Sequence, residues 1–368
     1  MRKFVMASLP ILLAGFLLPD ESCTAKHVEQ QDGPYVFYKD SMIHASYIVN
    51  DHGTKKVTQE SVPFADKEKM VLKVRTDVPG QFFNVRLKDS LVNEKTEYSN
   101  VTRQFVLSDI EGNFGAFRKL LQSNGVIDAS YNWTFGNGHL VLVGDFVDRG
   151  QDVTEVLWLI YSLEDKAKAA GGYVHYVLGN HEIMIMSGDI RYVHQTYHAN
   201  SMLLQTGYAM LFGENSELGR WLRTKNIMEK VGENLYVHGG ISPEINRLSI
   251  PLPVINEITR PWYADSTYNY SDPKLIQIYE SNSSPFWYRG YYSGDVKATP
   301  MQVDSTLSLY AVKQIVTGHS IVSDIISMWY GGKVINTDLE HAKGRSEALL
   351  IEGDKYYRVN QEGKKELL

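Results

Sequence analysis

The stretch "RQFVLSDIEGNF", residues 103–114, opens with an apolar run of strand length and closes with polar residues and glycine. Phe105, Val106 and Leu107 are followed directly by Ser108 and Asp109. A short continuous apolar run is typical of a strand buried on both faces. Since an isolated buried carboxylate is costly, the stretch predicts a strand whose end contributes polar side chains to a site.

The same pattern recurs along the chain. "HLVLVGD" (139–145) and "YVHYVLGN" (173–180) each end an apolar strand in a polar residue, and a helical pattern precedes each of them. "NLYVHGG" (234–240) and "AVKQIVTGH" (311–319) return as strands that end in histidine loops. Alternating strands and helices predict an α/β fold with parallel strands, in which functional groups gather at the carboxyl ends of strands.

Five strand ends therefore carry polar clusters in chain order. They read "SDIEGN", "GDFVDRG", "GNHE", "VHGG" and "TGHS". Bound cations satisfy several buried carboxylates and imidazoles at once, and a mixed oxygen and nitrogen set suits Mn, Fe or Zn. Each cluster alone is weak evidence, but the ordered set predicts a metal centre.

The second and third clusters also suggest chemistry. Of Asp145 and Asp148, one carboxylate can bridge two metals while the other holds a histidine in the required tautomer. Arg149 offers a planar fork of donors that matches phosphate oxygens. Asn180 and His181 are adjacent, so one can coordinate and the other can donate a proton.

Together, "GDFVDRG", "LGNHE", "VHGG" and "TGH" resemble the phosphoprotein phosphatases of the calcineurin-like metallophosphoesterase superfamily, and more narrowly the Shewanella-like bacterial phosphatases. The resemblance covers about residues 103–352. It implies an αββα sandwich of mixed sheets with the site at strand ends. It also implies two divalent metal ions, with Mn foremost and Fe, Mg or Zn as alternatives, and in-line attack by a hydroxide that bridges them.

Carried over by position, the resemblance implies a role for each site residue. The first metal would bind Asp109, Asp145 and the residue at position 111. The second would bind Asp145, Asn180, His238 and His319. His181, oriented by Asp148, would protonate the leaving-group oxygen, and Arg149 would hold the phosphate. Arg289 in "SPFWYRGYY" is the candidate for a further phosphate-binding arginine, with stacking on Trp287 or Tyr291 as the alternative.

Glu111 departs from the family pattern, which commonly has a histidine here. A glutamate can still coordinate a cation, and its added negative charge should favour harder metals such as Mn or Mg over Zn. It should also raise the pH needed to form hydroxide. The competing interpretation is that Glu111 forms a salt bridge with a neighbour and leaves one weak metal site.

The 368-residue composition is that of a globular protein, and the net charge of -6 argues against a general nucleic-acid binder. Residues 1–25 combine a basic start with a short apolar run, which predicts a signal peptide and export to the periplasm or the medium. Cys23 is the only cysteine. It leaves with the signal peptide or, as the alternative, carries a lipid anchor. No later segment is long and apolar enough to be a transmembrane helix.

We expect a small β-rich N-terminal module at 26–100 and a catalytic domain at 101–368 with a helical cap at about 183–230. The leading hypothesis is a secreted phosphomonoesterase that acts on Ser/Thr or Tyr phosphate in protein, or on small phosphate esters. The first alternative is a nucleotide or dinucleoside-polyphosphate hydrolase, with Tyr192, Tyr197 or Tyr208 as base-stacking candidates. The second is a non-catalytic phospho-ligand-binding protein, which only Glu111 supports.

Overall fold

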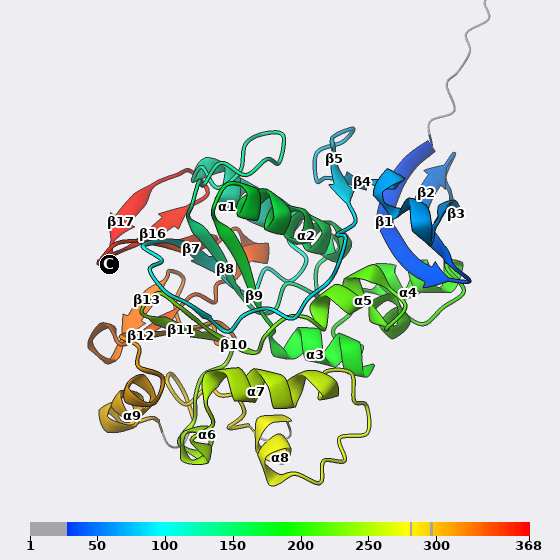
Figure 1. The fold of residues 1–368 in the computed structure, drawn as a ribbon. Coiled ribbons are helices and arrows are strands. Elements are labelled where there is room, and N and C mark those ends of the chain that lie inside the picture. The colour runs from blue at the N-terminus through cyan, green and yellow to red at the C-terminus, as the bar shows by residue number, and fades with distance from the viewer. Residues whose placement is uncertain (1–27, 280–281, 295–296) are drawn as a thin grey trace, which may run out of the picture.

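Two six-stranded β-sheets face each other in the computed structural model, which describes residues 28–279, 282–294 and 297–368 (Figure 1). The first sheet has the strand order β17-β16-β15-β7-β8-β9 and the second has β13-β14-β12-β11-β10-β6. The strands of the first sheet are β7 (Arg103–Leu107), β8 (His139–Val143), β9 (Tyr173–Val177), β15 (Glu347–Glu352), β16 (Lys355–Asn360) and β17 (Lys365–Leu367). Those of the second are β6 (Glu97–Tyr98), β10 (Met228–Val231), β11 (Asn234–Val237), β12 (Gln314–Thr317), β13 (Ser327–Trp329) and β14 (Val334–Asn336).

In each sheet, the strands that end in the polar clusters include parallel neighbours. β7, β8 and β9 are parallel neighbours, and so are β11, β12 and β14. The helices α1 (Phe114–Ser123) and α2 (Val153–Ala169) provide the crossovers between the first three. β15, β16 and β17 extend the first sheet antiparallel. In the second, β10 pairs antiparallel with β11 and β13 with β14, so both sheets are mixed, as predicted. The carboxyl ends of six parallel strands thus deliver loops to one edge of the sandwich.

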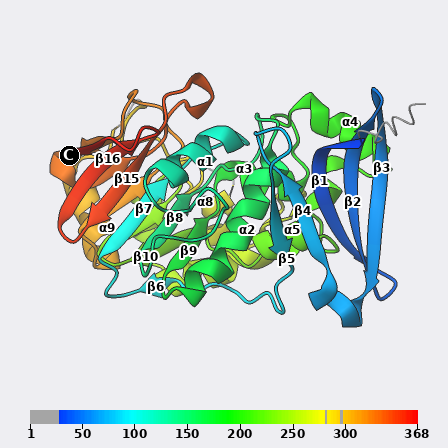
Figure 2. The same ribbon diagram turned by 90° about the horizontal axis from the view of Figure 1, so that it is seen from above.

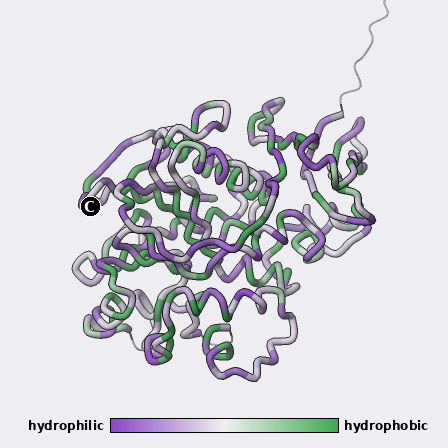
Figure 3. The backbone as a smooth tube through the Cα atoms, viewed as in Figure 1, coloured by the Kyte–Doolittle hydropathy of each residue, from purple (hydrophilic) through white to green (hydrophobic). Residues whose placement is uncertain are grey.

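The core between the sheets consists mainly of β-branched side chains. Val106, Val141, Val316 and Ile335 are fully buried there. α1 and α2 cover the outer face of the first sheet (Figures 1 and 2), and α7 lies on the outer side of the second (Figure 1). Hydrophobic segments concentrate in the central strands and in the helix stretches that pack on them (Figure 3). This is the αββα layering that the resemblance implied.

The N-terminal strands form a separate three-stranded antiparallel sheet beside α4 and α5. It contains β1 (Val28–Lys39), β2 (Met42–Asp51) and β3 (Thr54–Pro63). His52 and Gly53 join β2 to β3 with positive φ angles of 53° and 86°, which suit a tight hairpin turn. A second hairpin pairs β4 (Val71–Arg75) with β5 (Phe82–Arg86). β6 pairs with β10, so the end of the 26–100 segment lies in the main sandwich.

The remaining helices are short. The α-helices are α3 (Asn180–Ser187), α4 (Gln195–Leu203), α5 (Glu217–Leu222), α6 (Pro243–Leu248), α7 (Leu252–Thr259), α8 (Pro273–Tyr279) and α9 (Pro300–Tyr310). The 3-10 helices are η1 (Phe64–Lys69), η2 (Tyr208–Phe212), η3 (Arg260–Trp262), η4 (Tyr330–Gly332) and η5 (His341–Lys343). None of the helices in the described part of the chain has the length and apolar character needed to cross a bilayer. The predicted signal peptide and Cys23 lie outside the described residues.

Candidate metal centre

Left-handed backbone turns bring many of the predicted site residues over the sandwich edge. Asp109, Asp145 and His319 follow their strands with φ angles of 51°, 61° and 64°. Glu111, Asp148 and Arg149 also have positive φ. Non-glycine residues rarely adopt this conformation, and when they do they cluster at functional sites. Repetition of the same turn at successive strand ends makes these side chains converge.

Asp145, His238 and His319 form a group with the spacing of metal ligands. One donor atom from each lies within 4.8 Å of the others, and all three residues are buried. His238 Nδ1 donates to the carbonyl of Val143 (2.7 Å), which leaves Nε2 to face Asp145 Oδ2 and Asn180 Oδ1, each at 3.0 Å. A backbone acceptor on one imidazole nitrogen is the usual way to orient the other toward a metal.

The electrostatics of this group also fit a cation. Burial lowers the pKa of His319 to about 2, so its ring is neutral, and its Nε2 has no hydrogen-bond partner among the described residues. Burial opposes a charge on His238 as well, but Asp145 outweighs it and raises the pKa of His238 to about 9. An orphaned buried imidazole nitrogen beside carboxylate and amide oxygens is a donor set that suits Mn, Fe or Zn.

Asp109 joins the group from β7. Its carboxylate accepts hydrogen bonds from the backbone N–H of His319 at 3.1 and 3.3 Å. Burial, together with Asp338 and Asp145, raises the pKa of Asp109 well above its usual range. Several buried carboxylates with mutually unfavourable charges are what a divalent cation would neutralise.

Glu111 pairs with Arg149. Its Oε1 lies 2.6 Å from Arg149 Nη1, and its side chain is 18 % exposed. Burial raises the pKa of Glu111 to about 7 despite this guanidinium. The salt bridge corresponds to the competing interpretation of Glu111, and its role as a ligand of the first metal stays a prediction.

His181 and Asp148 form a buried pair beside the metal group. His181 Nδ1 lies 2.7 Å from Asp148 Oδ2, and its Nε2 lies 3.4 Å from Arg149 Nη2 and 3.8 Å from Asp145 Oδ2. Burial disfavours the imidazolium, but Asp145 and Asp148 together raise the pKa of His181 to about 9. An imidazole with Nδ1–H fixed on a carboxylate and Nε2 toward the site is arranged as a proton donor.

Glu182 is a positioning residue that sequence reasoning missed. Its wholly buried carboxylate accepts hydrogen bonds from the backbone N–H groups of Asp145 (2.9 Å), Phe146 (2.8 Å) and Gly179 (2.7 Å), and from the Tyr176 hydroxyl (2.9 Å). It thereby joins the loop after β8 to the start of α3. The sequence feature that could have identified Glu182 is the acidic residue at the end of "GNHE", two positions after Asn180.

Asp338 was also missed. It follows β14, is 4 % exposed, and has its pKa raised well above the usual range by burial and by Glu111 and Asp145. The rule that identified Asp109, an aspartate directly after a buried strand, would have found it in "VINTDLE". Asp338 therefore adds a carboxylate to the rim of the same centre.

Arg289 lies at the His319 loop. Its guanidinium donates to the carbonyl of His319 and to Ser320 Oγ (3.2 Å). Trp287 also packs on this loop, with its ring centroid 5.6 Å from that of His319. The structure thus places Arg289 beside His319, one of the three grouped candidate ligands, and the contact of Arg289 with phosphate stays a prediction.

Comparisons with known proteins agree with this geometry. Residues 102–323 match the family model of calcineurin-like phosphoesterases. A solved structure of a cold-active protein-tyrosine phosphatase from a psychrophilic Shewanella species superposes with a TM-score of 0.82 at 34% identity, covering 92% of this chain and 99% of that one. Shewanella-like protein phosphatase 2 of Arabidopsis thaliana is 25% identical over 69% of this chain and 75% of its own length.

A second kind of relative shares less of the chain. The symmetrical bis(5'-nucleosyl)-tetraphosphatase of Buchnera aphidicola is 32% identical over 38% of this chain and 45% of its own. The family model covers more than half of the chain, and Asp145, His238 and His319 lie within the matched residues. The chain belongs to the calcineurin-like phosphoesterase family and is a metal-dependent phosphatase, similar to the Shewanella-like protein phosphatases.

Proposed function

We propose that the protein is an exported phosphomonoesterase that removes phosphate from phosphorylated protein, tyrosine phosphate foremost, with the help of two divalent cations. The observation that carries this proposal is the buried His181–Asp148 pair, whose Nε2 faces the space between Arg149 and Asp145. A protein that only binds phosphate needs no oriented proton donor, so this pair argues against the non-catalytic alternative.

In this proposal each residue has a defined task. Asp109, Glu111 and Asp145 would hold one cation, and Asp145, Asn180, His238 and His319 would hold the other. When bound, the two cations neutralise phosphate charge and supply an activated water. Arg149, 48 % exposed, exchanges its contact with Glu111 for phosphate oxygens, and Arg289 contacts the phosphate from the His319 loop.

The proton follows a short path. His181 keeps its Nδ1–H on Asp148 and donates the Nε2 proton to the leaving-group oxygen as the phosphorus–oxygen bond breaks. Asp148 stabilises the resulting tautomer and does not itself take up a proton. A leaving group with a high pKa, such as an alkyl alcohol, depends on this proton more than an aryl leaving group does.

Support for an aryl leaving group comes from Tyr192. Its side chain is 43% exposed, and its ring centroid lies 5.1 Å from that of His181. The Arg149 guanidinium also lies 5.5 Å from this ring. When His181 protonates a tyrosine leaving group, the ring of that tyrosine would lie beside Tyr192. The Shewanella relative is described as a protein-tyrosine phosphatase.

The nucleotide alternative rests on the Buchnera relative and on base stacking. Of the three tyrosines considered for stacking, Tyr197 and Tyr208 are 1% and 3% exposed, so their rings belong to the core. Only Tyr192 remains accessible. The three tyrosines therefore offer less exposed ring surface for stacking on a nucleobase than the nucleotide-hydrolase alternative requires.

The experiment begins with metal-stripped protein. Hydrolysis of p-nitrophenyl phosphate is measured after addition of Mn, Mg, Zn or Fe, and we expect Mn to restore the highest rate. Phosphotyrosine, phosphoserine and phosphothreonine peptides are then compared with diadenosine tetraphosphate. A kcat/KM that is higher for the dinucleotide than for any peptide would refute the proposal and favour the nucleotide hydrolase.

Export is tested separately, because residues 1–25 lie outside the described part of the chain. Expression of the full chain followed by fractionation should yield a mature protein that begins after residue 25. A Cys23→Ala variant should fractionate identically. Retention of wild type in the membrane fraction, with release of the variant, would show lipid anchoring instead.

A further inference from the structure

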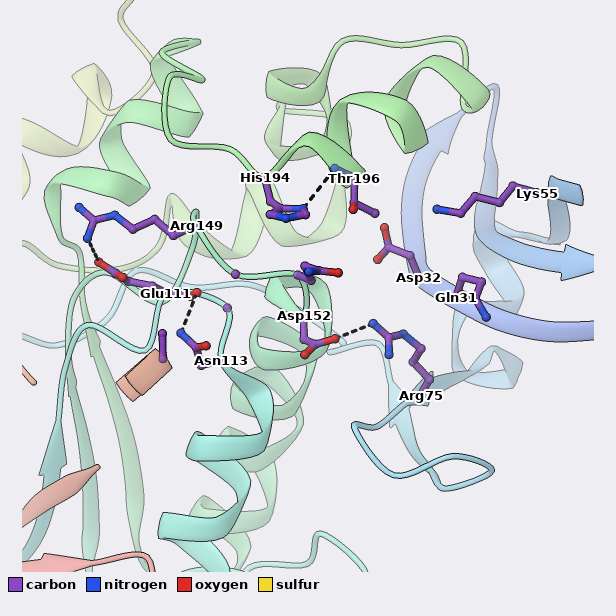
Figure 4. Close-up of a pocket in the computed structure, with 14 residues that line it drawn as sticks. Gln31, Asp32, Lys55, Arg75, Glu111, Asn113, Arg149, Asp152, His194 and Thr196 are labelled. Atoms are coloured by element: carbon purple, nitrogen blue, oxygen red, sulfur yellow. Dashed lines mark hydrogen bonds and ion pairs between the residues drawn. The ribbon is translucent and has the colours of Figure 1, made fainter. Parts of the chain in front are cut away.

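A polar pocket of about 770 Å³ leads from the phosphate-binding end of the site to the N-terminal sheet. Glu111 and Arg149 line one end, and Gln31 and Lys55, from β1 and β3, line the other (Figure 4). His194 lies along the wall between them. The pocket is far larger than one phosphate group requires and falls within the range of ligand-binding cavities. The N-terminal sheet therefore forms part of the space next to the reacting phosphate.

Most charges along this pocket already have partners. Arg75 Nη2 lies 2.6 Å from Asp152 Oδ1, and Arg75 Nε lies 2.8 Å from Glu155 Oε1. The carboxylate of Asp32 is 2 % exposed and accepts hydrogen bonds from the Gly33 N–H, the Tyr35 hydroxyl and the Asn200 amide. These groups fix the shape of the pocket and leave little charge for a ligand.

Lys55 is different. Its ammonium forms no ion pair or side-chain hydrogen bond with the described residues, and Figure 4 shows its side chain extending from the N-terminal sheet toward the pocket. The next residue, Lys56, pairs with Asp51 on β2. Successive side chains of a strand point to opposite faces, so Lys56 lies away from the pocket. The far end of the pocket thus offers one uncompensated cation.

The remaining lining suits a peptide rather than a base. Gln31 presents an amide that both donates and accepts hydrogen bonds, as peptide groups require. It lies where the β1–β2 register shifts, so it has no Cα partner on β2. The described residues that line the pocket include no Phe, Tyr or Trp. A nucleobase would find little to stack on there.

We propose that this pocket binds the polypeptide segment that flanks the phosphorylated residue, and that Lys55 recognises an acidic side chain in that segment. The N-terminal sheet is then a substrate-recognition element of the enzyme. This inference rests on the proposed phosphoprotein activity and adds the class of sequence that the enzyme prefers.

The test uses phosphotyrosine peptides in which one glutamate is moved through each flanking position, each with a glutamine counterpart. For wild type we expect kcat/KM to favour the best glutamate peptide about three- to five-fold, the upper range for an exposed ion pair. Lys55→Glu should abolish this preference and favour the matching lysine peptide, because the charges are exchanged. Lys56→Glu is the matched control and should keep the wild-type preference.

Hydrolysis of p-nitrophenyl phosphate separates recognition from catalysis. It does not reach the far end of the pocket, so its kcat/KM should be the same in wild type and Lys55→Glu. An unchanged glutamate preference in Lys55→Glu, or an equal fall for p-nitrophenyl phosphate and peptide, would overturn the inference.

A binding measurement keeps the inference testable if the proposed activity fails. Wild type that hydrolyses no phosphoester with any metal would refute the proposed function only. Fluorescence anisotropy of a labelled, non-hydrolysable phosphonate peptide then measures binding to the pocket without any turnover. A glutamate preference in Kd that Lys55→Glu reverses supports the inference, and equal Kd values for the glutamate and glutamine peptides contradict it.

Discussion

Replacing Glu182 with glutamine tests how the metal centre is held in place. The carboxylate of Glu182 is wholly buried and accepts four hydrogen bonds, three of them from backbone N–H groups on the loops that carry Asp145 and Asn180. Glutamine has nearly the same shape but only one oxygen. Its amide N–H₂ would face two of the donors, so two of the four hydrogen bonds would be lost.

The magnitude follows from those two bonds. A hydrogen bond to a charged group contributes about 1.5–3 kcal/mol, so two of them amount to about 3–6 kcal/mol. Burial and Asp145 raise the pKa of Glu182, so the charged form that accepts these hydrogen bonds is itself costly in the folded protein. We therefore expect the lower end, a loss of about 3 kcal/mol in the free energy of unfolding. Displacement of the Asp145 loop should also lower kcat/KM.

The assay is equilibrium unfolding in urea, followed by circular dichroism, with p-nitrophenyl phosphate hydrolysis measured on the same preparations. Glu60→Gln, on the exposed strand β3, is the control and should change neither quantity. A loss of less than about 1 kcal/mol in Glu182→Gln, with unchanged kcat/KM, would refute the view that this carboxylate holds the two loops together.

Three further substitutions probe the ligands and their surroundings. Glu111→His should shift the preferred metal toward Zn or Fe, and an unchanged activity profile across metals would place Glu111 outside the ligand set. Gly318→Ala would put a Cβ 2.3 Å from Asp109 Oδ2, so metal analysis should show the loss of one ion, whereas full occupancy would contradict that role for Asp109. Burial lowers the pKa of His341 to about 4, so its neutral form stabilises the fold above pH 6.5 and this contribution is lost as pH falls toward 4. Between pH 7 and 5 the free energy of unfolding, measured in urea, should therefore fall by about 2 kcal/mol less in His341→Gln than in wild type. The same fall in both proteins would refute the view that His341 is neutral in the folded state.

The parallel strands and the approach of the polar clusters at their ends could be predicted from the sequence because one pattern repeats. Buried parallel strands are recognisable as short apolar runs, and parallel strands bring their carboxyl ends to one edge. Asp109, Asp145 and His238 could be identified as neighbours in space on that ground. The left-handed turns that aim Asp109 and Asp145 left no comparable signal, since non-glycine residues adopt them.

Other features depend on contacts between distant segments. Glu111 forms its salt bridge with Arg149 because the Arg149 side chain points toward it, and the spacing of residues in the sequence does not predict that direction. The β-rich character of the N-terminal segment was predicted, but the bounds of β3 could not be, because β3 is exposed at most of its positions and shows little alternation of buried and exposed residues. The position of Lys55 at the far end of the pocket that leads from the phosphate site could not be foreseen, because it requires the N-terminal sheet to pack beside the loops of the catalytic domain.

Metal content combined with turnover tests the central claim most directly. We predict two metal ions per chain in wild type and in His181→Asn, with turnover of a phosphopeptide, whose leaving group needs the proton more than p-nitrophenolate does, lower by about 10²–10⁴-fold in the variant because only the proton donor is removed. His319→Ala should instead lose one ion. Loss of metal from His181→Asn, or full turnover in that variant, would contradict the assignment of His181 as the proton donor beside a dimetal centre.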